Sequence, residues 1–304
     1  WNDIKVPGNW EVQGYGVAIY TNHGYEFKPR NPQPPSLPEA NPVGVYRRDI
    51  DIPADWKERD IYLHLAGAKS GVYVYINGQE VGYSEDSKNP AEFLINKYVK
   101  PGKNVLTLKI FRWSTGSYLE CQDFWRISGI ERDVYIYSQP KVAIRDFRVT
   151  STLDDTYKNG IFKLAMDIRN NTSQPSKDYV IGYKVLDPKT DKVIAAFEMN
   201  TAIGANQTIP LFEEVKIEVL DDGKVIKTVE QKLTNAMEID VPNAVLWSPE
   251  SPKLYHLNIV LSNGGRVLDR VKSYFALRKV DVRKDECGYN RICLNNQPIF
   301  QYGP

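Results

Sequence analysis

The sequence predicts an all-β protein made of two consecutive β-sandwich domains. Aromatic residues make up 12% of the chain, which also has 20 Gly and 19 Pro. Aromatic residues favour strands, and glycine and proline favour turns. From residue 45 onward, apolar residues alternate with polar ones between closely spaced turn signals, and no long amphipathic helical pattern appears. At about 150 residues per domain, 304 residues correspond to two domains.

Residues 1–43 are irregular and rich in proline. The prolines between residues 29 and 38 exclude a helix or a central strand, because proline lacks the N–H donor. We expect an extended segment that wraps over a sheet, and a disordered linker is the alternative. Large aromatic residues argue against the linker, since disordered segments contain few of them. Those residues are Trp10, Tyr15, Tyr20, Tyr25 and Phe27.

The first sandwich, a jelly roll in our interpretation, is predicted between residues 45 and 137. Period-two alternation indicates strands at 45–52, 60–65, 71–76, 104–113 and 133–137. Asn77-Gly78 between two such runs is the strongest short hairpin signal. The apolar positions of this alternation on three of these strands are Ile61, Leu63, Leu65, Val72, Val74, Ile76, Leu106, Leu108 and Ile110.

A second sandwich, of immunoglobulin or fibronectin type, follows a boundary at Ser138-Gln139-Pro140. The predicted domains are therefore 1–140 and 141–280. Residues 281–304 read as a charged linker and a first strand, Ile299-Phe300, with nothing after it to pack on. The second sandwich contains strands at 142–150, 161–168, 179–186, 193–199, 215–220, 225–233, 236–241, 254–261 and 267–276.

The composition excludes several classes of protein. The net charge of +1 argues against nucleic-acid binding and against a polybasic membrane surface. No apolar run approaches the ~20 residues needed to cross a bilayer. Three scattered cysteines give neither a disulfide framework nor a zinc motif. The chain begins with Trp1, so the lack of a targeting segment leaves the compartment open, bacterial cytoplasm or periplasm included.

Residues 112–134 form the segment most suited to chemistry, because aromatic residues alternate there with acids and bases. Such a loop can stack a sugar on an aromatic ring and bind its hydroxyls with charged groups. The functional role of Asp123 rests on the family resemblance given below. For Trp113 and Trp125 the core is the favoured interpretation, since tryptophan is highly buried on average. Arg126 would then pair with an internal acid.

The histidines and the cysteine near this loop receive structural interpretations. His64 and His256 lie in predicted strands with apolar neighbours, and His23 has no motif around it. Cys121 has no obvious base near it in the sequence, and an unactivated thiol is mostly protonated. We therefore assign none of these side chains a ligand or nucleophile role.

The chain resembles the N-terminal part of glycoside hydrolase family 2, specifically the large bacterial β-galactosidases. The resemblance covers nearly the whole chain and is most specific in the first domain. The stretches that carry it are Val6–Gly16, Ala18–Asn22, Asn41–Tyr46, Val74–Gly78, Val81–Ser84, Pro90–Phe93, Trp113–Glu120, Gln122–Ile130, Arg132–Val134, Leu246–Tyr255 and Leu294–Ile299.

The resemblance implies a jelly-roll domain of the sugar-binding type, then an immunoglobulin-like domain, then a (β/α)8 barrel that performs retaining hydrolysis with two glutamates. One of those glutamates lies in an Asn-Glu motif on the barrel. No Asn-Glu dipeptide occurs in this sequence, and it contains no barrel. We therefore expect this chain to be non-catalytic by itself, and to support the barrel as its partner in the parent enzyme.

The resemblance also assigns site residues. Asp123 matches an aspartate that reaches into the barrel's active site and helps to hold a monovalent cation and a sugar hydroxyl. Na+ is the implied cofactor of the parent, with Mg2+ as a further candidate, and none is expected in the isolated chain. Lys69 stands where a related enzyme has a substrate-contacting asparagine, so we count it as substrate-binding. Because Lys69 departs from the family pattern, the substrate stays open among the alternatives that follow.

Three alternatives stay open at the level of sequence. The parent hydrolyses β-galactosides in the first hypothesis, and β-glucuronides or β-mannosides in the second. In the third, the chain is a stand-alone carbohydrate-binding module. A homo-oligomeric parent is compatible with each of them.

Overall fold

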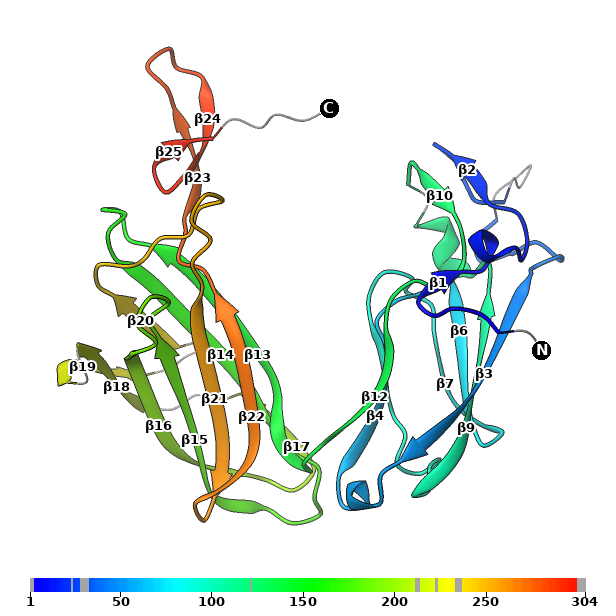
Figure 1. Cartoon of the computed structure of the whole chain (residues 1–304), viewed down its shortest axis with the longest axis horizontal. Coiled ribbons are helices and arrows are strands. Elements are labelled where there is room, and N and C mark those ends of the chain that lie inside the picture. Colours follow the sequence, from blue (N-terminus) through cyan, green and yellow to red (C-terminus); the bar gives the residue numbers. More distant parts are fainter. Residues whose placement is uncertain are drawn as a thin grey trace. The chain divides into compact units, whose positions relative to one another are not determined.

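The computed structural model describes residues 3–22, 24–27, 33–120, 122–210, 214–221, 224–232 and 237–299. The chain divides into two compact units, Trp1–Gln139 and Pro140–Pro304 (Figure 1). The described residues form strands and short 3-10 turns and contain no α-helix, which confirms the all-β class. Among them, no helix is long and apolar enough to span a bilayer.

Unit 1 consists of short strands and three 3-10 turns, η1 (Glu11–Gln13), η2 (Ala54–Trp56) and η3 (Thr115–Tyr118). The strands β1, β2 and β10 gather at one end of the unit (Figure 1). The strands are β1 (Gly8–Asn9), β2 (Ile19–Thr21), β3 (Val43–Ile52), β4 (Asp60–Leu65), β5 (Ala68–Lys69), β6 (Gly71–Ile76), β7 (Gln79–Ser84), β8 (Ala91–Leu94), β9 (Gly102–Phe111), β10 (Phe124–Arg126), β11 (Gly129–Ile130) and β12 (Val134–Gln139).

Two sheets of unit 1 enclose its core. One has the order β3-β9-β6-β7 and the other the order β12-β4-β8. The small sheets β1-β11-β5 and β10-β2 complete the unit. All nine apolar residues of the alternation named above are buried, from Ile61 on β4 to Ile110 on β9. The alternation therefore predicted both the strands and the face that each strand buries.

The Asn77-Gly78 hairpin is confirmed. Asn77 and Gly78 have φ values of 52° and 81°, as a two-residue type I′ turn requires. The turn joins β6 to β7 with Ile76 opposite Gln79. The Asn77 side chain also donates to Asn104 at 2.8 Å and accepts from the Val105 N–H at 3.0 Å, which ties the turn to β9.

Unit 2 is a second sandwich. Its sheets have the orders β13-β14-β17, with β20 also paired to β14, and β19-β18-β16-β15-β21-β22. The strands are β13 (Val142–Leu153), β14 (Gly160–Asn170), β15 (Ser176–Leu186), β16 (Val193–Ile203), β17 (Gln207–Pro210), β18 (Glu214–Asp221), β19 (Lys224–Lys232), β20 (Met237–Val241), β21 (Tyr255–Asn263) and β22 (Arg266–Phe275).

The core of unit 2 lies between these two sheets. Alternate residues of β14, from Phe162 to Ile168, pack against alternate residues of β15 and β21. Phe162 is fully buried, with its ring centroid 4.5 Å from that of Phe275. Strands occur at all the predicted places in this unit, and β17 is additional.

The end of the described chain differs from the sequence-based expectation. Residues expected as a charged linker form β23 (Val280–Lys284), which pairs with β24 (Asn290–Leu294). A tight turn at Asn295-Asn296, both with positive φ, then returns the chain to β25 (Gln297–Pro298) beside β24. Asparagine tolerates this backbone region, so the pair is a hairpin signal that the pattern of apolar residues did not reveal. Phe300, from the predicted last strand, lies outside the described residues.

Candidate functional site

The candidate site is the ribbon formed by β2 and β10 with the residues beside it. The two strands pair antiparallel, with Trp125 opposite Tyr20 and Arg126 opposite Ile19. This pairing brings Tyr20 to Asp123, 103 residues later in the chain. Both segments belong to the stretches that resemble the family, but nothing in the sequence indicates that they are in contact.

Asp123 is exposed, and its neighbours are aromatic. The Tyr20 hydroxyl donates to Asp123 Oδ1 at 2.5 Å, and this hydrogen bond, with some desolvation and the aspartate charge, raises the pKa of Tyr20. The Tyr20 and Trp125 rings lie 5.5 Å apart, and both are more than half exposed. Phe124 is 48% exposed, with the Lys88 ammonium 5.3 Å from its ring. The ribbon thus presents one carboxylate among aromatic faces.

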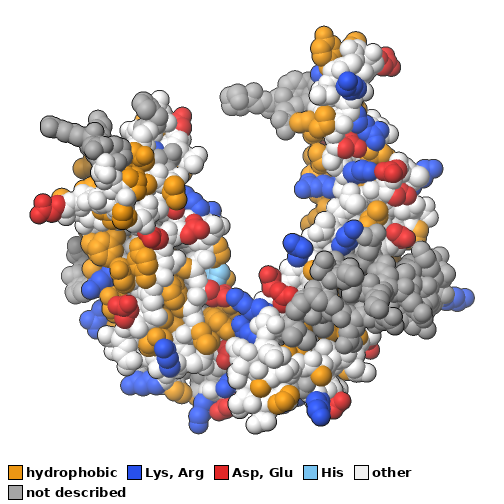
Figure 2. Space-filling model, turned by 180° about the vertical axis from the view of Figure 1, so that it is seen from behind, with side chains coloured by type: hydrophobic (Ala, Val, Ile, Leu, Met, Phe, Trp, Pro, Cys, Tyr) orange, Lys and Arg blue, Asp and Glu red, His pale blue; other side chains and the backbone are white. Residues whose placement is uncertain are grey.

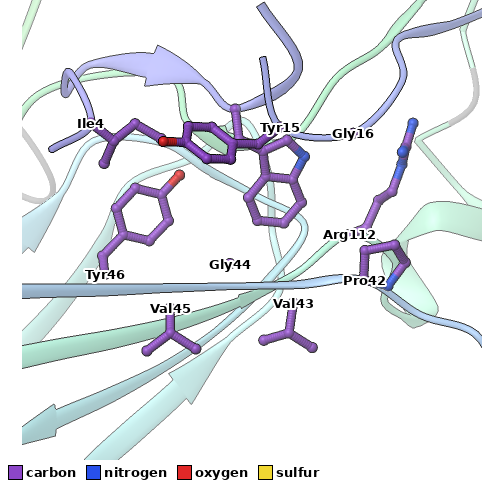
Figure 3. Close-up of a pocket in the computed structure, with 10 residues that line it drawn as sticks. Ile4, Tyr15, Gly16, Pro42, Val43, Gly44, Val45, Tyr46 and Arg112 are labelled. Atoms are coloured by element: carbon purple, nitrogen blue, oxygen red, sulfur yellow. The ribbon is translucent and has the colours of Figure 1, made fainter. Parts of the chain in front are cut away.

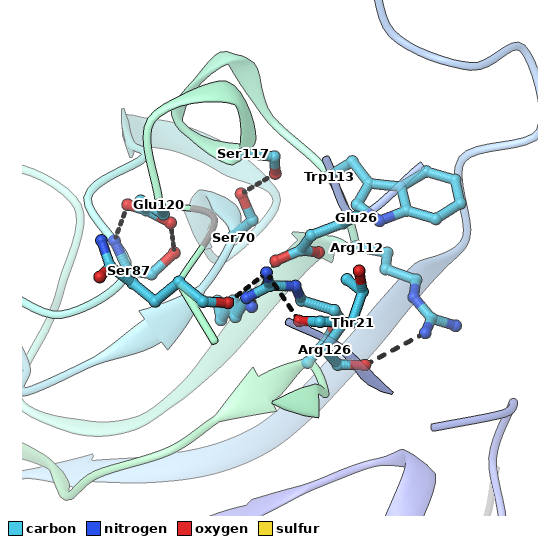
Figure 4. Close-up of polar contacts among 12 residues, drawn as sticks. Thr21, Glu26, Ser70, Ser87, Arg112, Trp113, Ser117, Glu120 and Arg126 are labelled. Atoms are coloured by element: carbon cyan, nitrogen blue, oxygen red, sulfur yellow. Dashed lines mark hydrogen bonds and ion pairs between the residues drawn. The ribbon is translucent and has the colours of Figure 1, made fainter. Parts of the chain in front are cut away.

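The buried side chain of Arg126 holds the backbone of this ribbon in place. It is 1% exposed and donates to the carbonyl oxygens of Gln122 and Thr21 (Figure 4). Arg112, also buried, donates to the Arg126 carbonyl at 3.3 Å and to the Val17 carbonyl at 2.8 Å. The expected partner of Arg126 was an acid, but the contacts within the described residues are to main-chain carbonyls. The guanidinium groups therefore fix the path of the backbone on both sides of Asp123.

A second set of contacts fixes the chain that enters this ribbon. Glu120 accepts from the Ser87 N–H at 3.0 Å and from the Ser87 hydroxyl at 2.5 Å. Ser114 and Ser117 form a capping box on η3, and Ser70 contacts both of their hydroxyls (Figure 4). These contacts join the 114–120 segment to the chain around residues 70 and 87.

Lys69 is not at the surface. Its side chain is 3% exposed, and its ammonium lies 2.5 Å from Oε1 of Glu26, which is 1% exposed. Apart from this ion pair, the carboxylate oxygens of Glu26 have no hydrogen-bond partner in the described part of the chain. Lys69 pairs through its backbone with Gly129 of β11, the short strand that follows β10 in the chain. Direct contact between Lys69 and a sugar stays a prediction.

The two tryptophans of the segment have different environments. Trp125 is 53% exposed, so its predicted place in the core is wrong. Trp113 is half-buried, and its ring lies 5.6 Å from that of Phe27. Buried Phe27 and Trp10 show that the proline-rich N-terminal segment packs on the sandwich, at least in its described part.

The two described histidines, His64 and His256, lie in no cluster suited to a metal ligand. His64 Nδ1 lies 3.4 Å from Glu92, with its ring stacked on Tyr135, and His256 Nδ1 lies 3.5 Å from Asp191. His23 and Cys121 lie outside the described residues.

The cation that the resemblance implies at Asp123 would need further oxygen ligands beside it. Carboxylate oxygen is a suitable ligand for a hard cation, but a site needs several oxygens. In the described part of the chain, no group of three or more His, Cys, Asp or Glu is placed to hold a metal ion. Asp123 alone does not form a cation site.

On the face shown in Figure 2, hydrophobic side chains lie among charged ones of both signs, in keeping with the net charge of +1.

Comparison with known proteins places the chain in a family. Residues 2–140 match the family described as "Glycosyl hydrolases family 2, sugar binding domain". Residues 142–278 match "Glycosyl hydrolases family 2". The chain belongs to glycoside hydrolase family 2, and its two units correspond to these two matched regions.

Similar proteins include β-galactosidases. The chain is 35% identical to the β-galactosidase of Priestia megaterium over 306 aligned residues, and 36% identical to that of Psychromonas ingrahamii over 295. It spans 27% and 26% of the length of these relatives. Most of the length of such enzymes therefore has no counterpart in this chain.

Solved structures show the same fold. A β-glucuronidase of Bacteroides uniformis aligns with 98% of this chain and 31% of its own, with a TM-score of 0.74 and 20% identity. A putative β-galactosidase of Bacteroides fragilis aligns with 85% of this chain and 36% of its own, with a TM-score of 0.68 and 16% identity. At such identities the likeness concerns the fold alone.

Proposed function

We propose that this chain is the non-catalytic N-terminal part of a retaining β-galactosidase. It supports a C-terminal catalytic barrel and completes one wall of the active site with the Asp123 ribbon. The observation that carries this proposal is the ribbon itself: an exposed carboxylate between aromatic rings, with its backbone held by buried Arg126. The β-galactosidase names of the relatives support the choice of substrate.

The role of Asp123 follows from its chemistry. A carboxylate accepts hydrogen bonds from sugar hydroxyls and can be one oxygen ligand of a cation such as Na+. Tyr20 holds one carboxylate oxygen, so the other stays available to a ligand. The exposed rings of Tyr20 and Trp125 can stack on the apolar face of a pyranose. The hydrolytic glutamates would come from the barrel.

Lys69 acts indirectly in this proposal. Because its ammonium is buried against Glu26, it holds the 24–27 segment to β5 and so supports the chain near the site. A buried, neutralised lysine offers no free positive charge of its own to a substrate, which suits a neutral galactoside better than a glucuronate.

The test has two parts. The purified 304-residue chain should not hydrolyse a nitrophenyl β-galactoside, and turnover by the pure chain would contradict the proposal. In the full-length protein, Asp123→Asn should lower kcat/KM for that substrate by about 100-fold or more, whereas Asp51→Asn, an exposed aspartate on β3, should not. Preference of the full-length enzyme for a glucuronide would replace the galactoside assignment.

A further inference from the structure

Unit 1 contains a pocket that lies outside the Asp123 ribbon and has no part in the proposed function. Its volume is about 390 Å³, within the range of small-molecule sites. It lies between β3 and the chain around η1 (Figure 3). The residues that line it are Ile4, Trp10, Tyr15, Gly16, Pro42, Val43, Gly44, Val45, Tyr46 and Arg112.

The walls of this pocket are aromatic rings set close to the backbone of β3. The ring of Trp10 packs on Gly44 so closely that a Cβ atom at that position would lie 2.1 Å from it. Tyr15 is 43% exposed and forms an outer wall. In Figure 3 the hydroxyls of Tyr15 and Tyr46 point to the same part of the pocket, beside Ile4. A flat ring fits such walls better than a flexible chain does.

Polar groups in the lining are few. The Tyr46 hydroxyl is buried and has no hydrogen-bond partner in the described part of the chain. Burial, together with the nearby Glu11 charge, raises the pKa of Tyr46 to about 12, so this hydroxyl is a neutral donor at physiological pH. A buried hydroxyl without a partner is costly, and a ligand that supplies one recovers that cost.

The lining also sets the charge of the ligand. Arg112 is the charged side chain among the residues that line the pocket, and it lies 3.8 Å from buried Glu11. Its Nη2 atom is already bonded to two main-chain carbonyls. The buried Nε of Arg112 has no hydrogen-bond partner in the described part of the chain, but the charge of Arg112 is paired with that of Glu11, so the pocket offers little to an anion. It also offers too few hydrogen-bond groups for a pyranose, whose ring of hydroxyls would lose more from water than it gains.

We propose that this pocket binds a neutral aromatic compound of one or two rings that carries a hydroxyl group, with the ring between Trp10 and Tyr15 and the hydroxyl at Tyr46. The proposal does not depend on the role of Asp123, because residues 123–125 do not line the pocket.

The experiment compares p-cresol with toluene, which lacks only the hydroxyl, on the 304-residue chain. Binding is followed by chemical shifts of the tryptophan indole N–H signals, with Trp10 assigned by a Trp10→Phe variant. We expect p-cresol to bind with a Kd on the order of 1 mM. Toluene should bind about fivefold more weakly, because one hydrogen bond is missing.

Two variants locate the site. Tyr46→Phe should abolish the preference for p-cresol over toluene without lowering the stability of the chain, since the lost hydroxyl has no partner. Tyr15→Ala should weaken both ligands about tenfold. Tyr135→Phe and Tyr274→Ala, at exposed tyrosines outside the pocket, are the matched controls and should change neither.

Three results would overturn the proposal. These are the absence of saturable p-cresol binding, a p-cresol preference that survives in Tyr46→Phe, and equal or tighter binding of methyl β-D-galactoside. The last result would make the pocket a sugar site instead.

Discussion

At the scale of single residues, the ion pair between Lys69 and Glu26 has the largest energetic consequence. Both side chains are at least 97% buried. The attraction within a buried pair roughly offsets the cost of removing two charges from water. Removal of one partner leaves the other charge buried without compensation, and that is strongly destabilising.

Glu26→Gln should therefore lower the free energy of unfolding of unit 1 by about 3–5 kcal/mol. The double variant Glu26→Gln with Lys69→Met should recover most of this loss, because no buried charge remains. Urea denaturation measures both values. Glu39→Gln, an exposed glutamate, is the control. A double variant as unstable as the single one would show that the pair matters through shape rather than charge.

Tyr20 reports on the Asp123 carboxylate. An ionised acceptor stabilises the protonated phenol, so the pKa of Tyr20 lies above its ordinary value of 10. In Asp123→Asn the amide carries no charge, and the pKa of Tyr20 should fall back toward 10. NMR of labelled tyrosine rings between about pH 8 and pH 12 measures this. An unchanged titration of Tyr20 in that variant would mean that the hydrogen bond does not form in solution.

The sequence predicted some features of the site and not others. The family resemblance singles out Asp123, and the structure places it at the surface. Trp125 is misassigned because average burial does not apply to a strand that lies in a two-stranded ribbon rather than in one of the core sheets. The Tyr20–Asp123 and Lys69–Glu26 contacts join segments distant in sequence, and no local pattern encodes such pairs.

At the scale of elements, η3 depends on Glu85. Its carboxylate accepts from the Thr115 hydroxyl at 2.7 Å and from the Gly116 N–H at 3.4 Å. Burial alone would raise the pKa of Glu85, but the hydrogen bonds outweigh it and hold the pKa below its ordinary value of 4.5. Stability from this lowered pKa is present above 4.5 and is lost as the pH falls through the folded-state value.

Glu85→Gln should accordingly destabilise unit 1 near neutral pH, and the difference from wild type should shrink between about pH 6 and pH 3. Urea denaturation across this range measures the effect. Asp55→Asn, an exposed acid in η2, should give a difference that does not follow this course. A pH-independent penalty in Glu85→Gln would rule out the ionised carboxylate as the cause.

Strand β14 has no room for a side chain at Gly160. A Cβ atom there would lie 2.4 Å from Leu277 Cδ1, and Leu277 is fully buried. Gly160→Ala should cost about 1–3 kcal/mol through overpacking. Adding Leu277→Val should relieve part of this cost by removing a methylene group. Thermal denaturation compares the two variants, and a neutral or stabilising Gly160→Ala would contradict the predicted clash.

Periodicity predicted the strands of the two sandwiches well because strands that bury one face show alternating apolar and polar residues. It did not reveal the β24–β25 hairpin, whose strands are short and largely exposed. There the signal lay in turn chemistry, at Asn295-Asn296, rather than in hydrophobicity.

At the scale of the whole molecule, the chain has two separate hydrophobic cores. One is built from residues of unit 1 and the other from residues of unit 2, and they share no member. Because each core is complete within its unit, we expect the units to unfold as separate cooperative transitions.

Phe162→Ala, in the core of unit 2, should destabilise that unit by about 3–5 kcal/mol and lower one calorimetric transition only. Leu63→Ala, in the core of unit 1, should destabilise that unit by about 2–5 kcal/mol and lower the temperature of the other transition. A common shift of a single transition in both variants would show that the units fold together.

The anchoring of the Asp123 ribbon by Arg126 also bears on how this chain can change over evolution. Arg126 donates hydrogen bonds to main-chain oxygens, which every residue type supplies, rather than to particular side chains. Asp123, Phe124 and Trp125 belong to neither core. A library randomised at these three positions should therefore consist mostly of folded proteins, so new ligand preferences can be selected there without loss of the scaffold.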